Sequence, residues 1–190
     1  MHFLFFCTIL EARNWKEVMF VQFVPFVLDT NNKEVSVEVE EMTIEDAQRT
    51  NEEPVWQTSW TSTYIQESRT ERYAVKRDEE LIALGAYEIS ENALLVHIVY
   101  MEAHPASNPT LDGGKPKYRG IGRLLIAQGI KLSIDNGLGG NVVLEAKTSE
   151  LAAHYERDFG AIRLPGLANA APRYLIADEA AKRIFFTYLK

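Results

Sequence analysis

Residues 117–124, with the sequence KYRGIGRL, have the residue types of an anion-binding turn. Gly120 and Gly122 carry no Cβ, so a ligand can approach their backbone closely. At the start of a helix, several backbone N–H groups lack a partner, and the helix dipole adds positive potential. Lys117, Arg119 and Arg123 supply charge. The stretch therefore predicts a pyrophosphate site, with a simple tight helix start as the alternative. It is neither a Walker A loop, because no Lys-Ser or Lys-Thr pair is present, nor a complete Rossmann G-x-G-x-x-G fingerprint.

The elements around this turn can be predicted from hydrophobic periodicity. Residues 120–135 repeat apolar side chains at helical spacing, and Asn136-Gly137 is a typical helix end. Strand patterns cover residues 73–77, 81–89 and 94–101, and the breaks between them are short enough for antiparallel hairpins. A long polar loop, residues 105–116, separates the last strand from the glycine turn.

The flanking segments complete an α/β pattern. Val35, Val37 and Val39 alternate with polar residues as in a strand, and Thr43 is a typical helix cap. Trp56, Trp60 and Tyr64 recur at a spacing of four residues, which predicts a second helix over residues 54–66. A strand at 141–146, a helix at 148–157, a strand at 173–176 and a helix capped by Asp178 follow. This order predicts a three-layer α/β/α fold.

Two of these segments resemble the GNAT (GCN5-related N-acetyltransferase) superfamily. Its pyrophosphate loop is Arg/Gln-x-x-Gly-x-Gly/Ala between a strand and a helix, and residues 117–122 look like it, with Lys in the first position. Residues 148–161 (TSELAAHYERDFGA) are similar to its second hallmark, a helix ending in Tyr-Glu-(Lys/Arg)-x-Gly-Phe. The departures are Thr148 where Asn is common, one extra residue before Gly160, and Ala161 in place of Phe. Residues 100–108 together with 117–120 also resemble a bacterial branch of the superfamily, which implies little about the acceptor.

The resemblance covers roughly residues 35–178 and implies a mixed sheet that is splayed at its centre, with pantetheine in the gap beside residues 96–103. It implies acetyl-CoA as co-substrate and no metal. The single Cys7 likewise excludes an internal disulfide and a multi-cysteine metal cluster. The residues implied for acetyl-CoA are Met101, Ala103, Lys117, Tyr118, Arg119, Gly120, Ile121, Gly122, Arg123 and Leu124.

Tyr155 matches the tyrosine that protonates, or donates a hydrogen bond to, the departing CoA thiolate in this superfamily. A phenol close to a thiolate of ordinary pKa near 8.5 can assist its departure. The alternative is a core tyrosine on an amphipathic helix.

The amine acceptor must lose a proton, which requires a base or a water relay. His97 and Glu102 are the two candidates in the splayed strand, and strand alternation predicts that they lie on opposite faces. His97 has the more suitable ordinary pKa, whereas Glu102 could instead bind the acceptor ammonium. Each could equally be structural. His104 and Asn108 are further loop candidates, and the tryptophan segment is either an acceptor wall or a core stripe.

Composition limits the partners and the compartment. A formal charge of −7 disfavours nucleic acid, and one cysteine makes a reducing cytoplasm the default. Residues 1–34 form an apolar extension that lacks the features of a signal peptide and is too interrupted to span a membrane. We expect this extension to pack on a domain of residues 35–190 or to form an oligomer contact, such as that of a homodimer, with membrane targeting as the alternative.

The leading functional hypothesis is direct transfer of acetyl from acetyl-CoA to a small-molecule or peptide primary amine. Cys7 is remote from both hallmarks and gives no support to a ping-pong route. The alternative is a catalytically silent CoA-binding or interaction module of the same fold. A tRNA-acylating toxin is disfavoured by the net charge.

Overall fold

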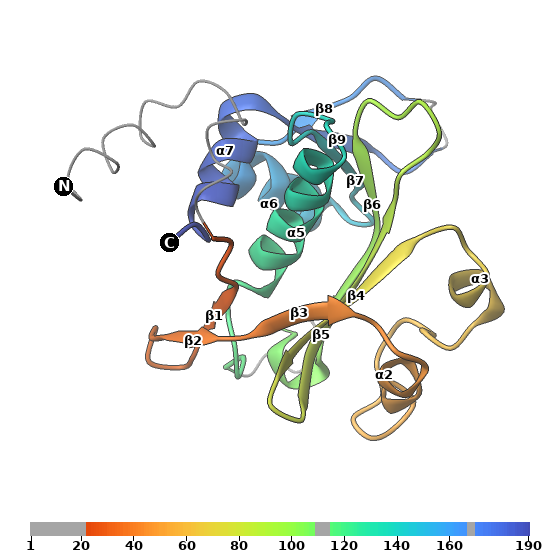
Figure 1. The fold of residues 1–190 in the computed structure, drawn as a ribbon, viewed down its shortest axis with the longest axis vertical. Helices are drawn as coiled ribbons and strands as arrows, with labels where there is room; N and C mark the ends of the chain where they lie inside the picture. The colour runs from red at the N-terminus through yellow and green to blue at the C-terminus, as the bar shows by residue number, and fades with distance from the viewer. Residues whose placement is uncertain (1–21, 109–114, 167–169) are drawn as a thin grey trace.

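The computed structural model describes residues 22–108, 115–166 and 170–190, and it contains a mixed sheet with helices on both faces (Figure 1). The seven-stranded sheet has the order β3-β4-β5-β6-β7-β9-β8, and β1 and β2 form a separate hairpin. The strands are β1 (Phe26–Leu28), β2 (Glu34–Ser36), β3 (Glu38–Glu41), β4 (Glu71–Arg77), β5 (Glu80–Glu88), β6 (Val96–Ala103), β7 (Val142–Glu145), β8 (Ile162–Arg163) and β9 (Arg173–Ile176). The helices are α2 (Ile44–Arg49), α3 (Thr63–Gln66), α5 (Ile121–Asp135), α6 (Ser149–Phe159) and α7 (Asp178–Phe186), with a short 3-10 turn, η2, at Pro105–Ser107.

Two hydrophobic clusters fill the two sides of the sheet and confirm the three-layer expectation. One cluster joins α5, α6 and α7 to one face, through residues such as Leu124, Ile130 and Phe185. The other lies on the opposite face under α2 and α3, and it contains Trp56 and Trp60. In Figure 1, α5, α6 and α7 accordingly gather on one side, and α2 and α3 on the other.

The centre of the sheet is splayed, as expected. β4, β5 and β6 pair antiparallel, as the hairpin breaks predict. β6 then runs parallel to β7, but their pairing covers only Val96↔Val142, His97↔Val143 and Ile98↔Leu144. β6 continues to Ala103 beyond the last of these pairs. The backbone edge of β6 after Ile98 therefore faces a gap instead of β7.

A bulge in β6 overturns the prediction that His97 and Glu102 lie on opposite faces. The register against β5 shifts between Ala86↔Tyr100 and Tyr87↔Ile98, so that β6 holds one extra residue there. An extra residue inverts the alternation of every side chain that follows it. His97 and Glu102 consequently share the face that carries α2 and α3.

The predicted helix over residues 54–66 is wrong, because only Thr63–Gln66 is helical. Trp60 is fully buried, and its indole and the preceding backbone N–H groups bind the carboxylate of Glu102. These tertiary hydrogen bonds and the burial of both tryptophans stabilise an irregular loop, and they outweigh the local helical periodicity.

Two smaller predictions also require correction. The valine pattern at 35–39 does not form one strand, because Val35 pairs with Val27 of β1 and Val39 pairs with Val75 of β4. The cap of α7 is Ala177 and not Asp178, which begins the helix at φ +48°. The starts of α2 and α6 match the prediction, because Thr43 accepts a hydrogen bond from Asp46 N–H and Thr148 accepts one from Leu151 N–H.

The part of the expected extension that the structure describes, residues 22–34, lies against the C-terminal end of the chain. Val24 N–H donates to Tyr188 O at 2.7 Å, and the Phe23 ring stacks on Phe185 at 5.6 Å. Residues 1–21, including Cys7, lie outside the described residues. Among the residues described, no helix combines the length and apolarity that crossing a membrane requires.

Candidate active site

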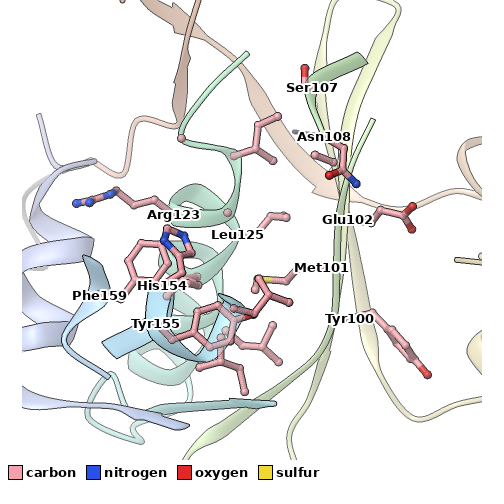
Figure 2. A pocket seen from close by; sticks show the side chains of 18 of the residues that line it. Tyr100, Met101, Glu102, Ser107, Asn108, Arg123, Leu125, His154, Tyr155 and Phe159 are labelled. Atoms are coloured by element: carbon pink, nitrogen blue, oxygen red, sulfur yellow. The ribbon is translucent and has the colours of Figure 1, made fainter. Parts of the chain in front are cut away.

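A cavity of about 640 Å³ opens where β6 and β7 diverge. Its walls are β6, the start of α5, the side of α6 and a short piece of the tryptophan loop, residues 57–58. Figure 2 shows Met101 directed toward Tyr155 and α5, whereas Tyr100 and Glu102 point to the other side of β6. The cavity thus reaches both faces of the sheet through the splay.

The start of α5 forms one end of this cavity. Gly120 is its cap at φ +81°, a left-handed conformation that glycine adopts without strain. The first hydrogen bond of the helix joins Leu124 N–H to Gly120 O at 3.0 Å, so the N–H groups of residues 121–123 precede the helical ladder. A Cβ placed on Gly120 or Gly122 would meet no atom within 4 Å. Space, unpaired N–H groups and the helix dipole therefore coincide at one place, which suits an anion.

Two parts of the molecule, β1 and η2, hold the segment that enters this helix. Arg119 exchanges two backbone hydrogen bonds with Leu28 of β1, at 2.8 and 3.0 Å. Lys117 N–H donates to Ala106 O at 2.9 Å, and Tyr118 N–H donates to Ser107 Oγ at 3.0 Å. The turn is therefore positioned without the N–H groups that face the cavity.

Most of the residues predicted to bind acetyl-CoA line the cavity. Met101, Ala103 and every residue from Tyr118 to Arg123 do so. Lys117 and Leu124 do not belong to the lining. The Lys117 ammonium binds Glu80 at 2.7 Å, which raises the pKa of the lysine, and Leu124 is fully buried in the core. The first position of the glycine motif thus makes an ion pair that supports the turn.

Tyr155 lies on the α6 wall with only 7% of its surface exposed. Its ring packs edge-on against Tyr174 at 6.0 Å. Burial raises the pKa of the phenol, so it carries its proton at neutral pH. The residue is therefore part of the core and also part of the cavity wall.

Glu102 is buried and its carboxylate is occupied by the tryptophan loop. It accepts hydrogen bonds from Gln57 N–H at 2.6 Å, Thr58 N–H at 3.1 Å and the Trp60 indole N–H at 2.9 Å. The carboxylate therefore fixes the loop that forms the cavity wall on the side of α2 and α3.

The structure does not bring His97 to the cavity. Its ring lies near the start of β6, with Nδ1 3.7 Å from Glu88, and is absent from the lining. His104 faces a separate cavity of about 170 Å³ beside Trp56, and burial lowers the pKa of its imidazole. Asn108 does line the main cavity.

The sequence did not single out several lining residues. His154, Asp158 and Phe159 come from α6, and Lys147 follows β7. Asp158 follows Tyr155 by three residues, a helical spacing that could have placed both on the same wall. Lys147 belongs to no motif, so no signal in the sequence indicated it. Across residues 22–108, 115–166 and 170–190, no group of three or more His, Cys, Asp or Glu side chains could hold a metal ion.

The sequence matches no protein-family model and no curated protein. Its fold is similar to solved structures of acetyltransferases. An aminoglycoside acetyltransferase, AAC(6')-Ib, in complex with coenzyme A is 15% identical, with a TM-score of 0.54 over 78% of this chain and 98% of that one. The same enzyme with coenzyme A and kanamycin is 16% identical, with a TM-score of 0.53 over 78% and 98%. The ribosomal-protein-S18-alanine N-acetyltransferase from Escherichia coli is 13% identical, with a TM-score of 0.51 over 75% and 95%.

Proposed function

On the premise that the chain has the fold of the GNAT acetyltransferases, we propose that it transfers an acetyl group from acetyl-CoA to a primary amine in a ternary complex. Acetyl-CoA would lie in the 640 Å³ cavity, with its pyrophosphate at the start of α5 and its thioester beside Tyr155. The amine would enter from the side of α2 and α3.

The observation that carries the proposal is the continuity of one cavity from an anion site to a buried phenol. Arg119, Gly120 and Gly122 line one end, and Tyr155 and Met101 line the middle. The free backbone edge of β6 beyond Ile98 runs between them, and its peptide groups can pair with the amides of pantetheine as a strand would. The chain therefore offers suitable partners for each chemically distinct part of acetyl-CoA.

In the proposed reaction, the amine nitrogen attacks the thioester carbonyl, and the carbon–sulfur bond breaks as the new carbon–nitrogen bond is completed. The sulfur leaves as a thiolate and takes the proton of the Tyr155 phenol. The nitrogen loses one proton to water, and the tyrosine is reprotonated from water, so the products are an amide and CoA thiol. Burial keeps the phenol protonated before transfer, which suits a proton donor.

The positions of the two candidate bases favour a catalytically silent binding module as a second candidate. His97 lies outside the cavity, and three N–H donors already occupy the Glu102 carboxylate. A protein that binds acetyl-CoA without transferring its acetyl group fits both observations. Turnover separates the candidates, because only the enzyme releases CoA thiol in the presence of an amine.

Binding is tested first, by thermal denaturation with acetyl-CoA, CoA or NAD. At a ligand concentration one hundred times its Kd, linkage predicts a stabilisation of about 2.7 kcal/mol for either CoA species. NAD should give no shift. Absence of a shift with both CoA species would remove the cavity assignment, and a shift without thiol release from any amine in a broad panel would select the binding module.

A further inference from the structure

The charged side chains that line the cavity divide into two groups, one near the start of α5 and one on the side from which the amine would enter. In the described part of the chain, the charged carboxylate and cationic side chains of the lining are Glu102, Glu145, Asp158, Arg119, Arg123 and Lys147. Glu145 binds Arg173 at 3.0 Å, and Asp158 binds Arg157 at 2.7 Å, so neighbouring cations neutralise both carboxylates. Arg119 and Arg123 flank the start of α5, where the pyrophosphate would lie.

Lys147 is set apart from that arginine pair. It follows β7, and its ammonium lies over the ring of Tyr100, 5.2 Å from the centroid. Tyr100 packs against the cluster under α2 and α3 and points away from Tyr155 (Figure 2). Burial raises the pKa of the Tyr100 phenol, which stays neutral beside the ammonium. The ring thus holds Lys147 on the side from which the amine would enter, since a cation is attracted to an aromatic face.

Glu102 is the carboxylate on the same side. Its partners are all neutral N–H groups, from Gln57, Thr58 and Trp60. The acceptor side of the cavity therefore combines a buried negative charge with a cation whose contact is an aromatic ring. A ligand that carries an ammonium and a carboxylate complements both charges.

We propose that the acceptor is an amine that also carries a carboxylate, with Lys147 as the residue that binds the carboxylate. This inference rests on the proposed acetyl transfer. Glu102 favours approach of the ammonium form, which loses a proton to water to become the attacking amine, and Lys147 selects acids over neutral or cationic amines. Because Lys147 is exposed at the mouth, its contribution is to acceptor binding and not to the bond-making step.

The test compares acids with their own amides at three spacings. Glycine, β-alanine and γ-aminobutyrate, and the amide of each, are assayed as acceptors by CoA thiol release. At least one acid should exceed its amide in kcat/KM by about tenfold, the effect expected of one charge-assisted hydrogen bond. Lys147→Glu should remove this advantage by raising the KM of the acid and lowering that of the cationic amide, while the KM of acetyl-CoA stays unchanged. Lys147→Gln should give an intermediate KM, and Arg163→Glu, at an exposed position of β8, should change none of these values.

Three other results would contradict the inference, and each would point to a different explanation. If the amides react and no acid is preferred, the inference is wrong and acetyl transfer stands. If Lys147→Glu raises the KM of acetyl-CoA instead, the lysine serves the co-substrate. If neither acids nor amides release thiol and a wider amine panel is also silent, the proposed function itself fails and takes the inference with it.

Discussion

Gly122 stands at the second position of α5 with open space where its Cβ would be. An acidic residue near a helix start interacts favourably with the dipole, and any ordinary residue improves on glycine in a helix. Gly122→Glu should therefore keep or raise the Tm of the free protein. It should also abolish the acetyl-CoA shift, because its carboxylate would occupy and repel the pyrophosphate site.

The opposite signs of these two effects make this variant more informative than a change at Gly120. Any side chain at Gly120 would be strained at φ +81°. Gly122→Gln is the matched control, with the same bulk and no charge, and should lose less affinity. Both readouts come from one thermal-shift series. A Gly122→Glu protein that still binds acetyl-CoA would show that the anion lies elsewhere.

Tyr155→Phe should bind acetyl-CoA normally and transfer acetyl more slowly. The hydroxyl acts on charge that develops only as the thiolate leaves, so the loss belongs in kcat, at about 10²-fold. Tyr174→Phe is the control for loss of a neighbouring hydroxyl in the same aromatic contact. Single-turnover rates measure the chemical step directly. Equal rates for wild type and Tyr155→Phe would show that the Tyr155 hydroxyl does not assist the chemical step and that the residue only packs in the core.

The sequence predicted positions well for residues that belong to a recognisable motif. Gly120 and Gly122 could be placed at a helix start from the glycine motif, and Tyr155 on the following helix from the second hallmark, and all three line the cavity. Lys117 illustrates the limit: a basic residue beside a phosphate turn suggests a ligand contact, but Glu80, far away in sequence, binds it. His97 shows the same limit, since the bulge that changes its relation to Glu102 has no local signal.

At the scale of elements, β1 is the strand that connects the proposed cofactor turn to the N-terminal segment. Leu28 and Arg119 form an isolated antiparallel bridge. The Arg119 guanidinium also donates to Thr30 O at 3.3 Å. This bridge fixes the backbone directly before Gly120, so the hairpin contributes to the geometry of the anion site.

Leu28→Pro removes the N–H that donates to Arg119 O and should loosen the turn. Leu28→Ala is the matched control, because it loses the same side chain but keeps the N–H. We expect kcat/KM for acetyl-CoA to fall about tenfold further in the proline variant, the effect of one lost backbone hydrogen bond.

S-acetylpantetheine, which lacks the pyrophosphate, separates positioning from general damage. Its kcat/KM should be equal in the two Leu28 variants, because it does not use the turn. A fall with both thioesters would mean that proline destabilises the domain as a whole. Equal values with acetyl-CoA would mean that the bridge does not position the site.

Secondary structure was predictable where local pattern and tertiary environment agree. α5 and the β4–β6 hairpins could be placed from periodicity and break residues. The tryptophan segment could not, because its conformation depends on one distant carboxylate, that of Glu102. The three-layer order followed from the sequence of elements, whereas the two-part valine strand depended on its pairing with β1.

At the scale of the whole molecule, the layer formed by α2 is attached to the sheet by an ion pair between the buried Asp46 and the half-buried Lys76. Asp46 is 2% exposed and lies 2.8 Å from Lys76. Burial alone would raise the pKa of Asp46, but hydrogen bonds from Lys76 and Thr43 outweigh it and lower the pKa below 3.8. A lowered pKa contributes stability above the ordinary value that is lost as the pH falls through the folded value.

We therefore expect the unfolding free energy of the wild type to decline more steeply than that of Asp46→Asn as the pH falls from about 5 to about 2. At neutral pH the variant should be less stable, because the half-buried Lys76 ammonium would keep only Glu40 as a carboxylate partner. Urea denaturation across the acid range measures both effects. Parallel pH profiles would show that the pair does not contribute to acid sensitivity.

Backbone hydrogen bonds and an ion pair join the two ends of the described part of the chain. Lys190 N–H donates to Gln22 O at 3.1 Å, Val24 N–H donates to Tyr188 O at 2.7 Å, and the Lys190 ammonium binds Glu34. The same N-terminal segment continues into β1 and its bridge to Arg119. Replacement of residues 188–190 by glycine should thus weaken acetyl-CoA binding from a site distant in sequence. By reciprocity, saturating acetyl-CoA should slow the hydrogen exchange of the backbone N–H groups at 188–190 in the wild type.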